Sequence, residues 1–126
     1  DHPDDQRADA APDPARAAAD LLAAARAFLP DAADPLPVAG RPHLLRVRAE
    51  GGEWAVRRLP ADAPPERVAA THALLRWLDE SGAVAAPVPR QLPDGTTVLA
   101  REGARFEVRS WLPGKVPPRA AVAYPA

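Results

Sequence analysis

The chain has 126 residues, with 16 basic and 17 acidic side chains, and it contains neither cysteine nor methionine. This length supports one domain with a single modest core. The composition excludes a disulfide framework and a thiolate zinc site, and no apolar run is long enough to span a membrane. Because methionine is absent, we expect the chain to be a piece of a longer product.

The charge is distributed unevenly along the chain. Residues 1–34 carry a net charge of −5, whereas the remaining residues carry a net charge of +4. A mildly basic body suits a domain that handles an anionic ligand. Residues 1–12 are acidic, contain proline and lack apolar periodicity, so we predict a disordered acidic tail there. With no cysteine and no visible signal segment, the sequence predicts a cytoplasmic location.

Residues 13–35 are predicted to form an N-terminal helix and a loop. Asp13 can cap the helix, Pro14 suits its first turn, and Pro30 ends it. The apolar residues of this helix recur on one buried stripe: Leu21, Leu22, Ala25, Phe28 and Leu29. Residues 31–42 hold four prolines or glycines, which predicts a loop.

The pattern then changes to the alternation typical of strands. Residues 43–48 and 54–59 predict a β-hairpin that turns at Gly51-Gly52, because two glycines can both adopt a positive φ. Alternation divides the second strand into two faces, one with Trp54, Val56 and Arg58 and the other with Ala55, Arg57 and Leu59.

A second, long helix is predicted from Pro64-Pro65 to Ser81-Gly82. Its apolar stripe comprises Val68, Thr71, Leu74, Leu75 and Leu78. Two or three short strands are predicted after it, at residues 88–92, 96–100 and 105–112. The aromatic residues predicted to lie in the core are Trp54, Trp77 and Phe106. The fold class is therefore α+β, a mainly antiparallel five-stranded sheet with one long packing helix and an additional N-terminal helix.

Three local patterns follow one another in order along the chain. They are the turn and strand at residues 51–59, the helix and elbow at residues 74–90, and the segment Ser110-Trp111-Leu112-Pro113-Gly114. In this order and spacing they resemble the N-terminal lobe of the protein-kinase-like fold, in particular the aminoglycoside phosphotransferase and homoserine-kinase type of small-molecule kinase. The resemblance implies a nucleotide-binding small lobe at residues 36–114 and a linker at residues 115–126 toward an absent C-terminal lobe.

The resemblance implies a nucleotide-binding site made of Arg57, Ala55, Gly40, Ser110, Trp111 and Leu112. Arg57 falls where the family's lysine contacts the phosphates, and Ala55 falls where a small side chain lets adenine lie flat. Gly40 belongs to the stretch that corresponds to the glycine-rich loop. The other three residues stand at the hinge, whose backbone would bond adenine.

The chain departs from the family pattern at three places. A guanidinium replaces the ammonium group at Arg57; it can bind phosphate bidentately, but it is longer and planar. The helix position that normally supplies a glutamate holds Thr71, flanked by His72, and neither is acidic. The glycine-loop stretch has one glycine, with Arg41 and His43 as alternative phosphate contacts.

The function implied is that of the ATP-binding small lobe of a phosphotransferase that phosphorylates a hydroxyl group of an aminoglycoside-like or amino-alcohol-like small molecule. The catalytic base and the magnesium ligands would come from the absent lobe, so no catalytic residue and no metal site is assigned to this chain. The acidic residues and the histidine at residues 1–5 are types that can bind a metal ion, but they are not preorganised as a metal site. Which acceptor is used stays open.

Two other interpretations stay open. A non-catalytic binding or interaction module with the same lobe shape would fit the three departures. A phosphate or nucleic-acid binder would use the arginines of the hairpin, although the scarcity of aromatic residues counts against nucleic acid. The expected partners are a nucleotide, an acceptor bound through the absent lobe, and a second copy through the uncovered sheet and hinge; no membrane is expected.

Overall fold

The computed structural model describes residues 13–82 and 85–111. In these residues it contains two helices, α2 (Pro14–Phe28) and α3 (Pro65–Ser81), and neither is long and apolar enough to cross a membrane. The strands are β1 (Ala33–Val38), β2 (Arg41–Ala49), β3 (Gly52–Arg58), β4 (Leu99–Arg101) and β5 (Ala104–Ser110). They form one antiparallel sheet in the order β1-β2-β3-β5-β4. The predicted α+β class with a five-stranded sheet is confirmed, and it is compatible with a kinase-like small lobe.

The prediction of a loop over residues 31–42 was wrong, because residues 33–38 form β1. This strand lies at the edge of the sheet and pairs only with β2. Pro35 and Pro37 lack an N–H group, and an edge strand tolerates that loss because one of its sides has no neighbour to bond. The register shifts near both prolines, so β1 is an irregular strand.

The prediction of a strand over residues 88–92 was also wrong. The segment makes an isolated bridge from Pro89 to Arg109. Arg90 N–H donates to Val108 O at 2.8 Å, and Ser110 N–H donates to Val88 O at 3.0 Å. Val88 N–H donates to the Ser110 hydroxyl at 2.8 Å, so the segment keeps a single bridge and does not become a strand. The strand predicted at residues 96–100 is displaced and becomes the short β4.

The predicted β2–β3 hairpin is confirmed, but its turn lies one residue earlier than predicted. Glu50 and Gly51 take positive φ values of 53° and 76°, and Gly52 already belongs to β3. Glu50 is held in this conformation because its N–H donates to Asp31 Oδ2 at 2.9 Å and its carboxylate accepts from the Arg90 side chain at 2.8 Å. Contacts distant in sequence thus select the turn.

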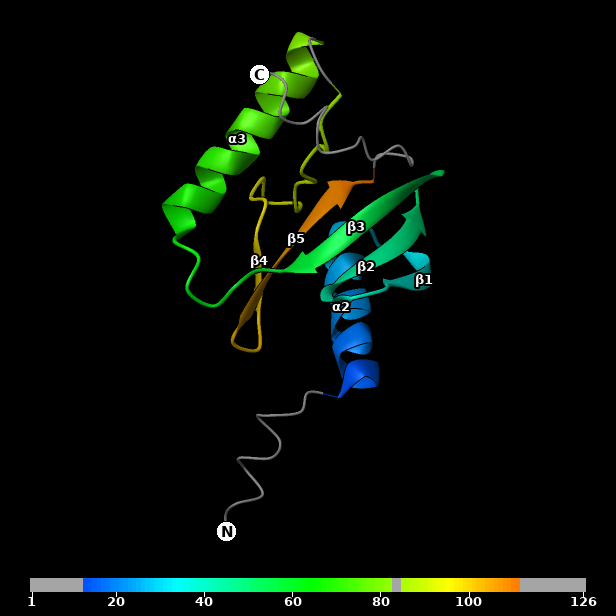
Figure 1. Ribbon diagram of the computed structural model, residues 1–126. Helices are drawn as coiled ribbons and strands as arrows, with labels where there is room; N and C mark the ends of the chain where they lie inside the picture. Colours follow the sequence, from blue (N-terminus) through cyan, green and yellow to red (C-terminus); the bar gives the residue numbers. More distant parts are fainter. Residues whose placement is uncertain (1–12, 83–84, 112–126) are drawn as a thin grey trace.

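Helix α2 forms as predicted and covers one face of the sheet. Asp13 Oδ1 caps it by accepting from Ala15 N–H at 3.0 Å. In Figure 1, α2 crosses behind β2 and β3. The core between them consists of buried apolar residues: Leu21, Ala24, Ala25, Phe28, Leu29, Ala32, Leu45, Val47, Ala49, Val56, Phe106 and Val108. Leu22 and Trp54 pack against this core and are only partly buried.

Helix α3 has the predicted bounds but not the predicted buried face. It ends at Gly82, whose φ of 74° is the left-handed conformation that favours glycine. Its buried residues are Val68 and His72, whereas Leu74 is 55% exposed and Trp77 is 61% exposed. The stripe that included Thr71 and Leu74 was therefore wrong, and so was the placement of Trp77 in the core.

Helix α3 stands away from the strands. It lies beyond the β4–β5 end of the sheet in Figure 1, and no Cα atom of α3 comes within 8 Å of a Cα atom of a described strand. The Arg105 side chain bonds the carbonyl groups of Pro60, Ala61 and Ala63 at 2.7–3.3 Å, which fixes the loop before the helix. Side chains rather than close backbone packing therefore hold α3 to the sheet.

Two substitutions of the same kind test this placement of the core. Leu45→Ala removes a side chain that is 1% exposed, and we expect it to lower the free energy of unfolding by about 2–5 kcal/mol. Leu74→Ala acts on a side chain that is 55% exposed and should change that free energy by no more than about 0.5 kcal/mol. Urea unfolding followed by circular dichroism measures both, and equal losses would contradict the fold.

Candidate functional site

The face of the sheet opposite α2 carries the charged side chains. Arg46 on β2 and Arg109 on β5 flank Ala55 on β3. Residues directly opposite one another in an antiparallel sheet share a face, and the next residue but one along a strand shares it too. Arg57 therefore lies on the same face as Ala55, opposite Glu107 of β5, while Val56 points into the core. This confirms the two faces predicted for β3.

A buried carboxylate gathers three basic side chains on this face. The Glu107 side chain is 1% exposed. Arg57 Nε donates to its Oε2 at 2.7 Å, and His72 Nε2 lies 2.5 Å from its Oε1. Arg109 Nε lies 3.2 Å from the same Oε1. The other nitrogen of the His72 ring lies 2.6 Å from Thr97 Oγ1, so the imidazole bridges β5 and the segment before β4.

The surroundings of Glu107 keep it ionised. Burial by itself raises the pKa of Glu107, but the hydrogen bond from His72, the charge of Arg109 and the hydrogen bond and charge of Arg57 outweigh it and lower the pKa to about 2. Because an ionised carboxylate only accepts hydrogen bonds, His72 Nε2 must carry the hydrogen that it shares with Glu107. Two arginines thus face one carboxylate, which leaves an excess of positive charge.

A cleft of about 180 Å³ opens between this cluster and the first half of α3. Arg57, Arg67 and Arg109 line it, together with Glu107. The side chains of Arg57 and Arg109 are 41% and 25% exposed. Both side chains approach Glu107 through Nε, and within residues 13–82 and 85–111 their terminal amino groups make no hydrogen bond to the protein. The cleft can therefore accept an anion.

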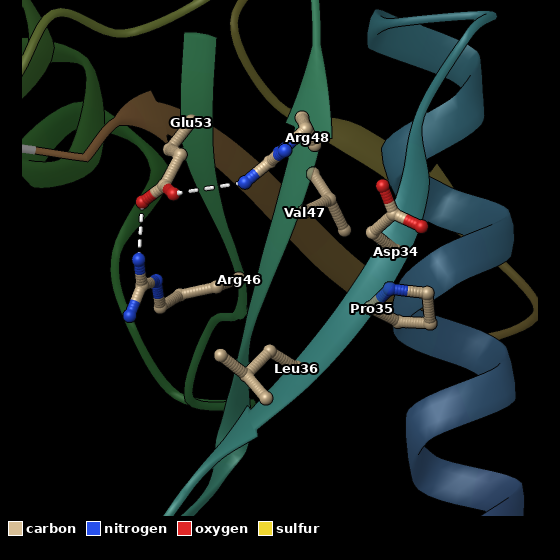
Figure 2. A pocket seen from close by; sticks show the side chains of 7 residues that line it. All are labelled: Asp34, Pro35, Leu36, Arg46, Val47, Arg48 and Glu53. Carbon is tan, nitrogen blue, oxygen red and sulfur yellow. Dashed lines mark hydrogen bonds and ion pairs between the residues drawn. The ribbon is translucent and has the colours of Figure 1, made fainter.

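A second hollow, of about 410 Å³, lies over β1, β2 and β3. Figure 2 shows Arg46 and Arg48 of β2 reaching toward the carboxylate of Glu53 on β3, with Leu36 of β1 beside them. The guanidinium of Arg46 also lies 4.6 Å from the centre of the Trp111 ring. Arg46 shares its face with Ala55, so both hollows belong to the face that α2 leaves uncovered.

The structure brings some of the predicted site residues together and separates others. Ala55 and Arg57 lie on the uncovered face, and the ring of Trp111 lies against Arg46 at the edge of it. Gly40, with a φ of 76°, forms the turn between β1 and β2.

The backbone and side chain of Ser110 do not join this group. Ser110 pairs with Trp54 and thus belongs to the other face, where its hydroxyl accepts from Val88 N–H at 2.8 Å. Trp111 N–H donates to Glu53 O at 3.0 Å. Leu112 lies outside the described residues. The binding roles of all six residues stay predictions.

Sequence reasoning missed Glu107, Arg109 and His72. A signal for Glu107 existed, because alternation puts it on the face opposite Phe106 and Val108, where Arg57 also lies. His72 was interpreted as an ordinary helix residue, yet its side chain is 4% exposed and points at Glu107. The carboxylate that orients the strand cation thus comes from a neighbouring strand and not from the helix.

Comparison with known protein families agrees with this geometry. The model of the phosphotransferase enzyme family (APH) matches residues 42–126, about two thirds of the chain. The chain belongs to the phosphotransferase enzyme family. The span that matches this family includes α3 and every residue of the Glu107 cluster. No curated protein and no solved structure matches the chain.

The lowered pKa of Glu107 predicts a loss of stability in acid. Its folded-state value, about 2, lies below its ordinary value of 4.5. The ionised carboxylate therefore stabilises the fold fully above about pH 5, and about 3 kcal/mol of that stability should disappear as the pH falls toward 2. Glu107→Gln should lower stability at neutral pH and flatten this acid dependence, as measured by urea unfolding across the range.

Glu80→Gln is the matched control, because Glu80 is exposed on α3. It should keep the wild-type acid dependence. If Glu107→Gln kept that dependence as well, the ionised cluster would not be the origin of the effect.

Proposed function

We propose that this chain is the ATP-binding small lobe of a phosphotransferase that phosphorylates a hydroxyl group of a small molecule. Family membership supports phosphoryl transfer. The observation that carries the nucleotide-binding role is Arg57, which β3 holds on the uncovered face and which lines the cleft beside α3. Phosphoryl transfer depends on positive charge delivered to the phosphates from a rigid element, and a central strand of the sheet is such an element.

The layout of the uncovered face suits an extended nucleotide. Ala55 lies between Arg46 of β2 and Arg109 of β5 on this face, and its small side chain would leave room for a flat ring. Arg46 and Trp111 already stack at 4.6 Å, so they offer a planar surface on which a purine can pack. In this arrangement the base lies over Ala55, and the phosphates extend toward Arg57.

Magnesium would enter with the triphosphate. Within the described part of the chain, no group of three or more acidic or histidine side chains is placed to hold a metal ion. We therefore assign the magnesium ligands and the catalytic base to the larger lobe, as the family resemblance implies. That lobe would also select the acceptor, an aminoglycoside-like or amino-alcohol-like molecule.

The proposal is tested by calorimetric titration of the chain with Mg-ATP. Arg57→Ala should weaken binding by about tenfold or more, because it removes a charged hydrogen-bonding partner of the phosphates. Arg58→Ala is the matched control, since it removes the same side chain from the next position, on the opposite face of the same strand. It should leave the affinity unchanged.

Two results would contradict this function. Equal effects of the two substitutions would remove Arg57 from the site. No binding of Mg-ATP to the wild-type chain would instead favour a non-catalytic binding module with the shape of this lobe.

A further inference from the structure

We propose that Arg57 and Arg109 form one paired phosphate-binding site, and that Glu107 is the positioning residue that holds the pair in place. This inference rests on the proposed function and deepens it, because it names the residues that would hold the phosphates of the nucleotide. It adds a second cation, from β5, to the one that the family resemblance implies on β3.

The strand register brings the two arginines together. Glu107 lies directly opposite Arg57, and Arg109 is the next residue of β5 on the same face. Neighbours on one face of a strand are about 7 Å apart along the chain, a spacing that long guanidinium side chains readily span. Both side chains line the same cleft of about 180 Å³, so one ligand in that cleft can reach both of them.

Glu107 faces the Nε atom of each arginine, through a hydrogen bond with Arg57 and through an ion pair with Arg109. Its Oε2 accepts from Arg57 Nε at 2.7 Å, and its Oε1 lies 3.2 Å from Arg109 Nε. A guanidinium held at Nε keeps its two terminal amino groups free, and these are donors in a fixed planar arrangement that suits phosphate oxygens. The carboxylate thus fixes both arginines without occupying the groups that would bind the ligand.

The charges in the cleft favour an anion. Arg57 and Arg109 together outnumber the single carboxylate, and Arg67 from the first part of α3 adds a further positive charge. Arg109 Nε is buried and makes no well-aligned hydrogen bond, so its guanidinium is not fully satisfied by the described residues. An anion bound at the terminal amino groups would balance this excess positive charge.

Helix α3 acts on the pair through His72. The imidazole holds Glu107 Oε1 at 2.5 Å, and it is the helix's buried polar side chain on this face. In the pattern that the resemblance implies, a helix glutamate orients the strand cation directly. Here a strand carboxylate orients the cation, and a helix histidine orients the carboxylate.

The experiment measures dissociation constants of tripolyphosphate, ATP and adenosine by calorimetry near neutral pH. Arg109→Gln should weaken binding of tripolyphosphate and of ATP by about tenfold and leave adenosine unchanged. Arg58→Gln, on the opposite face of β3, is the control. If Arg109→Gln stays within about twofold of that control for tripolyphosphate, the paired site is overturned.

The positioning role of Glu107 is tested by the direction of the change. Glu107→Gln removes a negative charge beside two arginines, so on charge alone it should tighten binding of tripolyphosphate. A positioning residue predicts the reverse, a loss of about tenfold, because the freed arginines no longer converge on one anion. Tighter or unchanged binding would overturn the positioning role.

Arg109→Lys keeps this test decisive if Glu107→Gln does not fold. Lysine preserves the charge but has no Nε–H with which to face Glu107. This variant should therefore bind tripolyphosphate several-fold more weakly than the wild type. Equal binding would overturn the pairing. The failures of the two proposals are distinct. If ATP binding depends on Arg57 but not on Arg109, only the paired site is contradicted. If tripolyphosphate binding depends on Arg109 and ATP binds no more tightly than tripolyphosphate, only the nucleotide-binding role is contradicted.

Discussion

The buried carboxylate of Glu107 is the constraint on which the uncovered half of the molecule depends. An ionised carboxylate that is 1% exposed is costly to bury unless its oxygens are well bonded, and removing one of its partners would leave an uncompensated charge. Arg57 and His72 bond one oxygen each, and the charge of Arg109 lies beside them. The carboxylate therefore needs the three basic groups, and their positions in turn depend on it.

This constraint also explains how α3 can be ordered without packing closely on the sheet. A helix is usually held by an apolar stripe, but here Val68 is the apolar residue of α3 that is buried, and Leu74 and Trp77 are exposed. Apolar packing and charged side chains are thus divided between the two faces. The apolar core under α2 stabilises the sheet, while the opposite face keeps its charges and two hollows available.

The parts of the fold that could be predicted from sequence are those that local chemistry decides. Asp13 and Gly82 mark helix ends through capping and a left-handed φ, which need no distant partner. The strand at residues 33–38 could not be predicted, because its prolines are acceptable only at a sheet edge, and the edge is a property of the assembled sheet. The exposure of Trp77 likewise depends on the distance between α3 and the strands. The periodicity of apolar residues in the sequence does not predict that distance.

The site divides in the same way. Alternation alone places Ala55 and Arg57 on one face, but the pairing of Arg57 with Glu107 joins residues 50 positions apart and depends on β3 and β5 becoming neighbours. Once that register is known, the arginine in place of the usual lysine becomes understandable. A single ammonium group would have to divide itself between the carboxylate and a ligand, whereas a guanidinium gives Nε to Glu107 and keeps both terminal amino groups for an anion. In the site that we propose, the arginine in place of the lysine and the carboxylate on the strand in place of the helix are therefore two parts of one arrangement.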